Sequence, residues 1–386
     1  MKILLVNYEW PPLGGGGGVG MADVARVLAC RHDVHVLTSG TGDLPAVEHV
    51  QPDDLTVFRS KVWFRNARAV ATIPSMLSFY PTGAWLGRRL VRSHSYDVIN
   101  TWFAIPSGPT GVHVARAARV PHVLTLIGGD IYDPSKSYSP HRNPVLGQVV
   151  RRVIRKADRV AAISSDVAAR AREYHRAAGD IRVIPLGVDA VTTPQICRDD
   201  LGLSPDAVYL ICVGRLVRRK DHPSLLRAVQ QLGRRDVHLL ILGDGPERSR
   251  LEALARELGI EGHVSFLGHV DEDAKIRHLA CADVFVMPSL HEGFGLVYLE
   301  GMHQGLPVIA ATNSGASEFL EDSTTGFMVP PGAPGNLCEA IRRLVDDPDC
   351  RRRMGEANRK VAARFTVDRC ARMYESLFQD AIAEFS

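Results

Sequence analysis

The 386-residue sequence has no long hydrophobic run, few aromatic residues and no paired cysteine motif. No segment reaches the roughly 18 consecutive apolar residues that a membrane-spanning helix needs. The opening MKILLVNY has four apolar residues between Lys2 and Asn7, too few for a secretory signal. The seven cysteines are scattered and contain no C-x-x-C pair, which excludes a disulfide framework and a zinc site. We therefore expect a cytoplasmic protein.

The composition, with 45% hydrophobic and 23% charged residues, is ordinary for a soluble globular protein. A single core stops growing near roughly 250–300 residues, so the length predicts two domains. Charge is uneven: residues 1–195 hold 23 basic against 15 acidic side chains, and the remainder holds 23 against 28. The basic half indicates either attraction to an anionic acceptor or membrane surface or a solvated face. We expect no nucleic acid partner.

Short apolar runs alternate with helix-period segments along the chain, which predicts an α/β fold with two doubly wound, Rossmann-like domains. Residues 187–207 are rich in Pro, Asp and Thr and are predicted to be a linker. The predicted domains are 1–190 and 195–365, followed by an amphipathic helix at about 366–386. Ligands bind such sheets at the carboxyl ends of the strands, so we expect the site in the cleft between the domains.

The stretch YEWPPLGGGGGVG, residues 8–20, places five glycines between a predicted strand and a predicted helix. Its G-x-G-x-x-G spacing is typical of a dinucleotide turn, but six residues separate the strand from Gly15 and the second strand does not end in an acidic residue. A glycine loop before a helix still suits a phosphate. A phosphate site and a flexible loop both remain open.

The second half carries the more specific pattern. Arg215 and Lys220 follow its first strand in VGRLVRRKD, where two cations suit a diphosphate or belong to a solvated surface. The segment MPSLHEGFGLVYLEGM, residues 287–302, predicts a strand, a loop with Glu292, and a helix from near Gly295 that carries Glu300. Carboxylates accept from sugar hydroxyls and a helix start favours an anion. A capping Glu292 with an exposed Glu300 is the alternative.

The motifs GGGGGVG, LGVDA, VGRLVRRKD, GDGP, EGFGLVYLE and RFTVDRCARMYESLF occur in this order along nearly the whole chain. Together they resemble the retaining glycosyltransferases of the GT-B fold, family four. The resemblance implies an acceptor-binding first domain, a second domain that binds a nucleotide diphosphate sugar, and a C-terminal helix that packs back on the first domain. It also implies a hexose-type sugar and a UDP- or GDP-linked donor.

The resemblance assigns roles residue by residue. Arg215 and Lys220 bind the diphosphate, Glu300 the ribose hydroxyls, and Glu292 the transferred sugar, with Glu292, Arg215 and Lys220 forming the catalytic set. The backbone of Phe294, Gly295 and Leu296 contacts sugar or phosphate, and Gly16, Gly17 and Gly18 close on the donor phosphates. No cofactor and no metal are implied, since cations and helix amides stabilise the leaving group.

One position departs from the family pattern. Many relatives have a His at the end of the strand in VLTLIGGDIY, where this chain has Ile127. Asp130, in the Gly-Gly-Asp turn that follows, is the candidate contact to the acceptor or sugar, with a plain turn aspartate as the alternative. The pairs Asp271 with Asp273 and Asp347 with Asp349 adjoin predicted helix starts, where acidic residues are expected without a metal.

Residues 61–93 mix aromatic and apolar side chains with five arginines: Arg65, Arg68, Arg88, Arg89 and Arg92. Such a segment suits the inner face of an anionic membrane, and a lipid-linked acceptor with it, or else a helix with a solvated basic face. Two other functions share the architecture: a sugar-nucleotide 2-epimerase, and a non-catalytic sugar-nucleotide binding protein. Product analysis without acceptor separates the first from a transferase, and absence of turnover marks the second.

Overall fold

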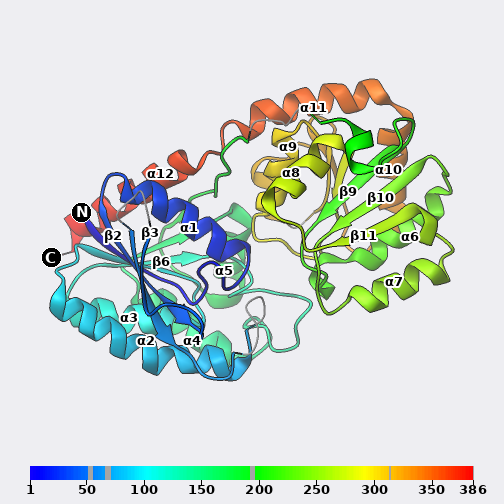
Figure 1. Ribbon diagram of the computed structural model, residues 1–386. Helices are drawn as coiled ribbons and strands as arrows, with labels where there is room; N and C mark the ends of the chain where they lie inside the picture. Colours follow the sequence, from blue (N-terminus) through cyan, green and yellow to red (C-terminus); the bar gives the residue numbers. More distant parts are fainter. Residues whose placement is uncertain (51–54, 66–70, 192–195, 313, 386) are drawn as a thin grey trace. The chain divides into compact units, whose positions relative to one another are not determined.

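The computed structural model describes residues 1–50, 55–65, 71–191, 196–312 and 314–385. The chain forms two compact units: unit 1 comprises Met1–Gly187 with Val367–Ser386, and unit 2 comprises Val188–Thr366. Each unit is a sheet covered by helices, as predicted for the α/β class (Figure 1). Among the described residues, no helix is both long and apolar enough to cross a membrane.

The sheet of unit 1 has eight strands in the order β3-β4-β2-β1-β5-β6-β7-β8. All neighbours pair in parallel except β3 with β4. The strands are β1 (Lys2–Val6), β2 (Asp33–Gly40), β3 (Val47–Val50), β4 (Leu55–Lys61), β5 (Val98–Trp102), β6 (His122–Leu126), β7 (Arg159–Ala162) and β8 (Ile181–Val183). The strand order reverses between β1 and β5, which is where such sheets bind ligands.

Six helices belong to unit 1: α1 (Gly16–Ala29), α2 (Ile73–Ser93), α3 (Gly108–Ala118), α4 (Pro144–Lys156), α5 (Ser165–His175) and α12 (Val367–Glu384). Figure 1 shows α2 and α3 on one face of the sheet, and α1 and α12 on the other. The chain end returns to this unit through α12, whose buried Tyr374 packs 5.4 Å from Trp102 between ring centroids. Arg31 adds a 2.7 Å ion pair to Glu375 of α12.

The sheet of unit 2 has six parallel strands in the order β11-β10-β9-β12-β13-β14. They are β9 (Val208–Val213), β10 (Val237–Leu242), β11 (Val264–Gly268), β12 (Val284–Met287), β13 (Val308–Ala311) and β14 (Gly326–Val329). The helices are α6 (His222–Leu232), α7 (Arg248–Glu257), α8 (Glu272–Cys281), α9 (Leu296–His303), α10 (Pro334–Asp346) and α11 (Pro348–Ala362). Here the strand order reverses between β9 and β12.

Candidate functional site

The loops that follow β9 and β12 meet at the reversal point of the unit 2 sheet. Lys220 ends a 3₁₀ turn, Arg218–Lys220, in the first loop, and Glu292 lies in the second. Lys220 Nζ donates to Glu292 Oε2 at 2.6 Å, and Arg219 Nη1 lies 3.2 Å from the same oxygen. Two loops far apart in sequence are therefore joined by one carboxylate and two cations.

Backbone contacts hold these loops together. Leu290 N donates to Arg219 O, and Arg219 Nη1 donates to His291 O at 2.7 Å. The loop after β12 also packs closely against the loop after β13, where a Cβ on Gly315 would lie 2.0 Å from Gly293 O. Gly315 N donates to Glu292 O at 2.8 Å. The position of Glu292 is thus fixed by its backbone as well as by its ion pairs.

In this cluster, burial and the neighbouring charges shift the pKa values of Glu292 and Lys220 in opposite directions. Burial raises the pKa of Glu292, but Arg219, Lys220 and the nearby His291 together lower it below its ordinary value. Burial lowers the pKa of Lys220, and the attraction of Glu292 offsets only part of that shift. The carboxylate of Glu292 is 13% exposed and the side chain of Lys220 is 10% exposed. The cluster is therefore an ionised triad with one net positive charge and limited contact with water.

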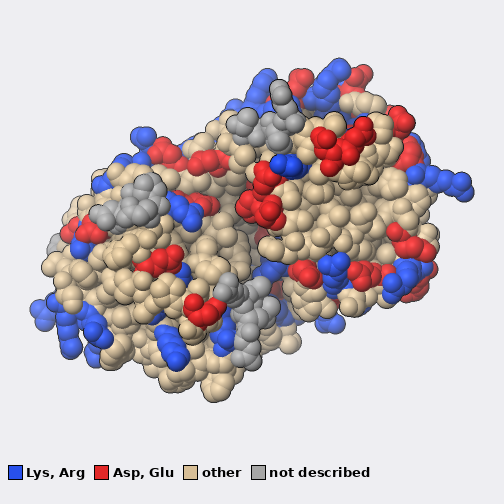
Figure 2. Space-filling model, viewed as in Figure 1, with Lys and Arg blue, Asp and Glu red and all other residues tan. Residues whose placement is uncertain are grey.

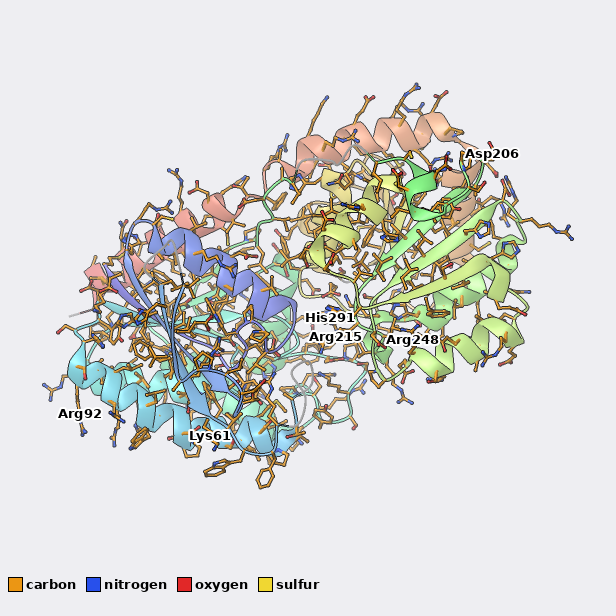
Figure 3. The ribbon with its side chains drawn as sticks, viewed as in Figure 1. Lys61, Arg92, Asp206, Arg215, Arg248 and His291 are labelled. Atoms are coloured by element: carbon orange, nitrogen blue, oxygen red, sulfur yellow. The ribbon has the colours of Figure 1, made fainter. Side chains whose placement is uncertain are left out.

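Arg215 and His291 lie at the same edge of the unit 2 sheet as this triad (Figure 3). Arg215 is exposed and is separated from the end of β9 by Gly214, whereas His291 is only 1% exposed. The sequence predicts Arg215 at this site but not Arg219 or His291. The run Arg218-Arg219-Lys220 was the available signal for Arg219.

Helix α9 begins beside Glu292. Gly295 precedes the helix with φ +90°, a conformation that favours glycine, and a Cβ there would lie 2.4 Å from Tyr298 Cδ2. Phe294 is 2% exposed and packs edge-on against Phe319, 5.3 Å between centroids. The side chain of Phe294 therefore belongs to the core, which leaves the backbone of residues 294–296 as the part that the predicted contact at the helix start requires.

Glu300 lies on α9 and meets a lysine from α8. Lys275 Nζ is 2.8 Å from Glu300 Oε2 and 2.7 Å from Glu272 Oε2. Burial lowers the pKa of Lys275, but Glu300 and Glu272 raise it, and the net shift is upward. The sequence analysis did not single out Lys275, because the pairing of α8 with α9 is not visible in the sequence.

The glycine loop of unit 1 follows β1 at the reversal point of its sheet. Gly15 caps α1 without a side-chain cap, and Glu9 Oε2 accepts from Gly15 N at 3.1 Å. A Cβ on Gly17 would lie 2.5 Å from Phe103 Cζ and 3.1 Å from Ile127 Cγ2. Gly18 approaches the backbone of Glu9, whereas a Cβ on Gly16 would meet nothing within 4 Å. Gly17 and Gly18 are therefore close-packed against their own unit, and Gly16 alone of the three is open.

Asp130 lies in the turn after β6 and is 5% exposed. Its Oδ2 accepts from Ala104 N at 2.6 Å, and its Oδ1 accepts from Ile127 N at 3.1 Å and Gly128 N at 2.8 Å. Burial raises the pKa of Asp130 to about 6, although these backbone donors oppose the shift. The carboxyl group joins the loops after β5 and β6, as expected of a turn aspartate, and shapes the edge on which Gly17 lies.

Each of the two acidic pairs lies at a helix start, and its first member caps the helix. Asp271 accepts from Ala274 N at the start of α8, and Asp347 accepts from Cys350 N at the start of α11. Over the described ranges, no group of three or more His, Cys, Asp or Glu side chains is placed to hold a metal ion.

Comparison with known proteins identifies the family. The profile described as Glycosyl transferases group 1 matches residues 195–361, and that of Glycosyltransferase Family 4 matches residues 14–191. The chain is 30% identical over 391 residues to a GDP-mannose-dependent alpha-(1-6)-phosphatidylinositol monomannoside mannosyltransferase of Mycobacterium tuberculosis, with 96% of each chain covered. It is 32% identical to the lipopolysaccharide core biosynthesis glycosyltransferase LpsD of Rhizobium meliloti, over 78% of this chain and 80% of that one.

Solved structures give the fold. Sucrose-phosphate synthase from Thermosynechococcus elongatus has a TM-score of 0.89 at 24% identity, covering 99% of this chain and all of that one. Anabaena HepE in complex with UDP-glucose has a TM-score of 0.76 at 21% identity, covering 98% of this chain and all of that one. These likenesses confirm the predicted GT-B fold class. The chain therefore belongs to the glycosyltransferases, with a Family 4 region followed by a group 1 region.

Proposed function

We propose that the protein transfers a hexose from a UDP- or GDP-linked sugar to a hydroxyl acceptor, with retention of anomeric configuration and without a metal ion. The observation that carries this proposal is the triad of Lys220, Arg219 and Glu292 at the reversal point of the unit 2 sheet. Relatives support the donor class: one is named as GDP-mannose-dependent, and HepE was crystallised with UDP-glucose. No cofactor is needed, because the nucleotide sugar is a substrate.

Lys220, Arg219 and Arg215 are the proposed diphosphate ligands. As the bond from the sugar C1 to the phosphate oxygen breaks, negative charge grows on the diphosphate and positive charge on the sugar. Lys220 and Arg219, which are fixed and largely desolvated, stabilise that charge without reorganising, and the exposed Arg215 adds a further positive charge. The backbone amides of Phe294, Gly295 and Leu296 add the positive end of α9. The glycine loop, Gly16 to Gly18, is proposed to close on a donor phosphate, with the amides of Gly16 and Gly17 as the donors, since Gly18 N already donates to Gly15 O.

Glu292 is the proposed contact to the sugar hydroxyls. Both cations approach its Oε2. An ionised carboxylate held in place by two cations accepts from sugar hydroxyls and orients the sugar. In retention, the acceptor oxygen bonds to C1 on the face that the diphosphate leaves, and the acceptor proton passes to the leaving phosphate oxygen. Glu292 then has no nucleophilic role.

Glu300 is the proposed ligand of the ribose hydroxyls, and Asp130 a proposed acceptor or sugar contact. The three hydrogen bonds that Asp130 accepts from backbone amides stabilise the loop edge against which Gly17 packs. Asp130 is therefore better placed to influence sugar binding by positioning this edge than by contacting the sugar directly. The acceptor class is proposed to be a lipid-linked or cell-surface glycan precursor at the inner face of a membrane. The names of the relatives, which include lipopolysaccharide core and phosphatidylinositol mannoside enzymes, support it.

Calorimetric titration of UDP, GDP, ADP, TDP and NAD tests the donor site first. We expect one nucleoside diphosphate to bind, and Arg215→Ala or Lys220→Ala to remove that binding. Arg218→Ala is the matched control, since Arg218 is an exposed arginine of the same 3₁₀ turn and has no contact with Glu292. Binding of NAD alone would mean that the glycine loop is a dinucleotide site and that the transferase mechanism is wrong.

Turnover is then measured with the sugar nucleotide of the base that binds, against a panel of glycolipid acceptors, with and without EDTA. We expect transfer that survives EDTA, an unchanged anomeric configuration by NMR, and no transfer by Glu292→Ala. Conversion of the donor to its 2-epimer without acceptor would identify an epimerase. Donor binding with no turnover on any acceptor would identify a binding protein.

A further inference from the structure

Three neighbouring helices of unit 1 carry positive charge only. Helices α2, α3 and α4 contain no Asp or Glu. They hold eight basic residues: Arg88, Arg89, Arg92, Arg116, Arg151, Arg152, Arg155 and Lys156. Figure 2 shows Lys and Arg gathered on the margin of unit 1 where α2 and α3 lie, and Figure 3 labels Arg92 there. Helices that only support a sheet normally mix both signs of charge, so this composition requires a separate explanation.

A groove of about 600 Å³ runs between these helices. Its basic lining comes from all three of them: Arg88 of α2, His113 and Arg116 of α3, and Arg152 and Lys156 of α4. The floor is apolar and includes Val112, Val149 and Val153. Over the described residues, no carboxylate lines the groove. The pKa of Lys156 is lowered by desolvation and by the charges of Arg116, Arg152 and Arg155, as expected where cations lack a counter-ion.

Exposed apolar side chains lie along α2, one of the three helices that line the groove. Ile73, Leu77 and Tyr80 follow one another at helical spacing on α2 and are 52%, 69% and 46% exposed. Trp85 is 61% exposed, and the Arg89 guanidinium lies 5.0 Å from its ring centroid. Tyr80 also meets His113 edge-on at the groove, 6.2 Å between centroids. An aromatic and aliphatic fringe beside a basic groove is the arrangement that binds the interface of an anionic bilayer.

Not every arginine of the predicted membrane segment belongs to this surface. Arg65 is 9% exposed, donates to Ser39 Oγ and lies 4.9 Å over the Tyr8 ring, so the prediction that it faces a membrane is wrong. Arg68 lies outside the described residues. The basic side chains of this surface include those of α3 and α4. Their proximity to α2 is not visible in the sequence.

We propose that the groove between α2, α3 and α4 binds the phosphate of an anionic phospholipid and docks unit 1 on a bilayer, with the apolar fringe entering the interface. Charge complementarity carries the inference, because five cationic or titratable side chains surround one space without a carboxylate. The groove is lined by side chains of three helices, between residues 80 and 88 of α2, 109 and 117 of α3, and 149 and 156 of α4, whereas the glycine loop follows the carboxyl end of β1. The inference rests on the proposed membrane location and names the surface that provides it.

Flotation of the full chain with vesicles tests the proposal, without nucleotide so that the donor site has no influence. We expect binding to phosphatidylcholine vesicles that contain phosphatidylglycerol, weaker binding at high salt, and none to phosphatidylcholine alone. The triple variant Arg88→Gln, Arg116→Gln, Arg152→Gln is expected to bind roughly 100-fold more weakly, since each basic residue near an anionic surface contributes about 1 kcal/mol. The tryptophan emission shift on binding should be smaller in Trp85→Phe.

The matched control removes three exposed arginines of the same unit that lie outside α2, α3 and α4: Arg26→Gln, Arg172→Gln, Arg372→Gln. Equal losses in the two triple variants would show that general charge and not the groove binds the vesicle. If the unaltered protein fails to float, the membrane location itself is wrong, although the donor titration still stands. Binding of glycerol phosphate in the groove without flotation would also overturn docking, in favour of a soluble ligand. Circular dichroism verifies that each variant is folded.

Discussion

Lys275 Nζ of α8 lies 2.8 Å from Glu300 Oε2 of α9 and is only 12% exposed. The lysine also pairs with Glu272, one turn earlier on its own helix. This relationship fixes both the charge and the direction of the carboxylate that we propose binds ribose. A carboxylate held in place loses less conformational freedom when it accepts from two hydroxyls than one that moves freely.

We predict that Lys275→Met weakens nucleoside diphosphate binding by about tenfold, the cost of one poorly placed charge-assisted hydrogen bond. The loss should be much smaller for a 2′,3′-dideoxynucleoside diphosphate, because that ligand has no ribose hydroxyls for Glu300 to accept from. Calorimetry with both ligands measures the difference. Glu272→Gln is the control, since Glu272 is 83% exposed and its replacement leaves the Lys275–Glu300 pair in place. An equal loss for both ligands would mean that Lys275 only stabilises the fold.

The Lys220–Glu292 pair predicts that substitutions at these two positions have non-additive effects on the stability of unit 2. Removing one partner of a buried pair leaves an uncompensated charge and costs about 3 kcal/mol or more. We therefore expect Lys220→Met to destabilise unit 2 by that order, and Lys220→Met with Glu292→Gln to recover a large part of it. Hydrogen exchange of peptides from β9 and β12 measures the effect within unit 2. Additive losses in the double variant would show that the two side chains act independently.

Much of the fold was predictable because buried parallel strands are short apolar runs between helix-period segments. Most strands of both sheets follow this rule, but β3, Val47–Val50, does not, because its side chains are exposed or half-buried and include Glu48 and His49. An edge strand of four residues with mixed polarity has too little hydrophobic pattern for the sequence to predict it as a strand. The carboxyl-end rule likewise located Lys220 and Glu292, since both follow strands that meet where the sheet order reverses.

What the sequence could not supply were contacts between distant elements. Arg219 became visible only when its contact with Glu292 was known, and Lys275 only when α8 was seen to pack beside α9. The individual glycines of the loop were equally indistinguishable. Their roles differ because Phe103 and Glu9, from other parts of unit 1, crowd some positions and leave Gly16 open.

Asp130 predicts a pH dependence of stability. Its pKa is raised from 3.8 to about 6, chiefly by burial, so the folded state binds its proton more tightly than the unfolded state does. The resulting stabilisation is complete below about pH 3.8 and is lost as the pH rises through about 6. Relative to Asp130→Asn, the unaltered protein should lose up to about 3 kcal/mol between pH 4 and pH 7. A constant difference between the two proteins over this range would contradict the assignment.

Tryptophan fluorescence restricts the measurement of unfolding to unit 1. All four tryptophans, Trp10, Trp63, Trp85 and Trp102, belong to that unit, and Trp10 and Trp102 are buried. Urea unfolding followed by emission therefore reports unit 1 even when unit 2 unfolds separately.

Gly16 and Gly17 separate the steric role of the glycine loop from its proposed role at the donor. A methyl group on Gly17 would lie 2.5 Å from Phe103 Cζ, so Gly17→Ala should destabilise unit 1 by about 1–3 kcal/mol. The same change at Gly16 meets nothing within 4 Å and should be neutral or stabilise by up to about 1 kcal/mol. If the loop amides bind a donor phosphate, that open methyl group hinders the approach, and kcat/KM should fall by about tenfold or more at unchanged stability. Urea unfolding and donor turnover of the two variants decide between the roles: a fully active Gly16→Ala protein would leave the loop with packing alone to explain its glycines.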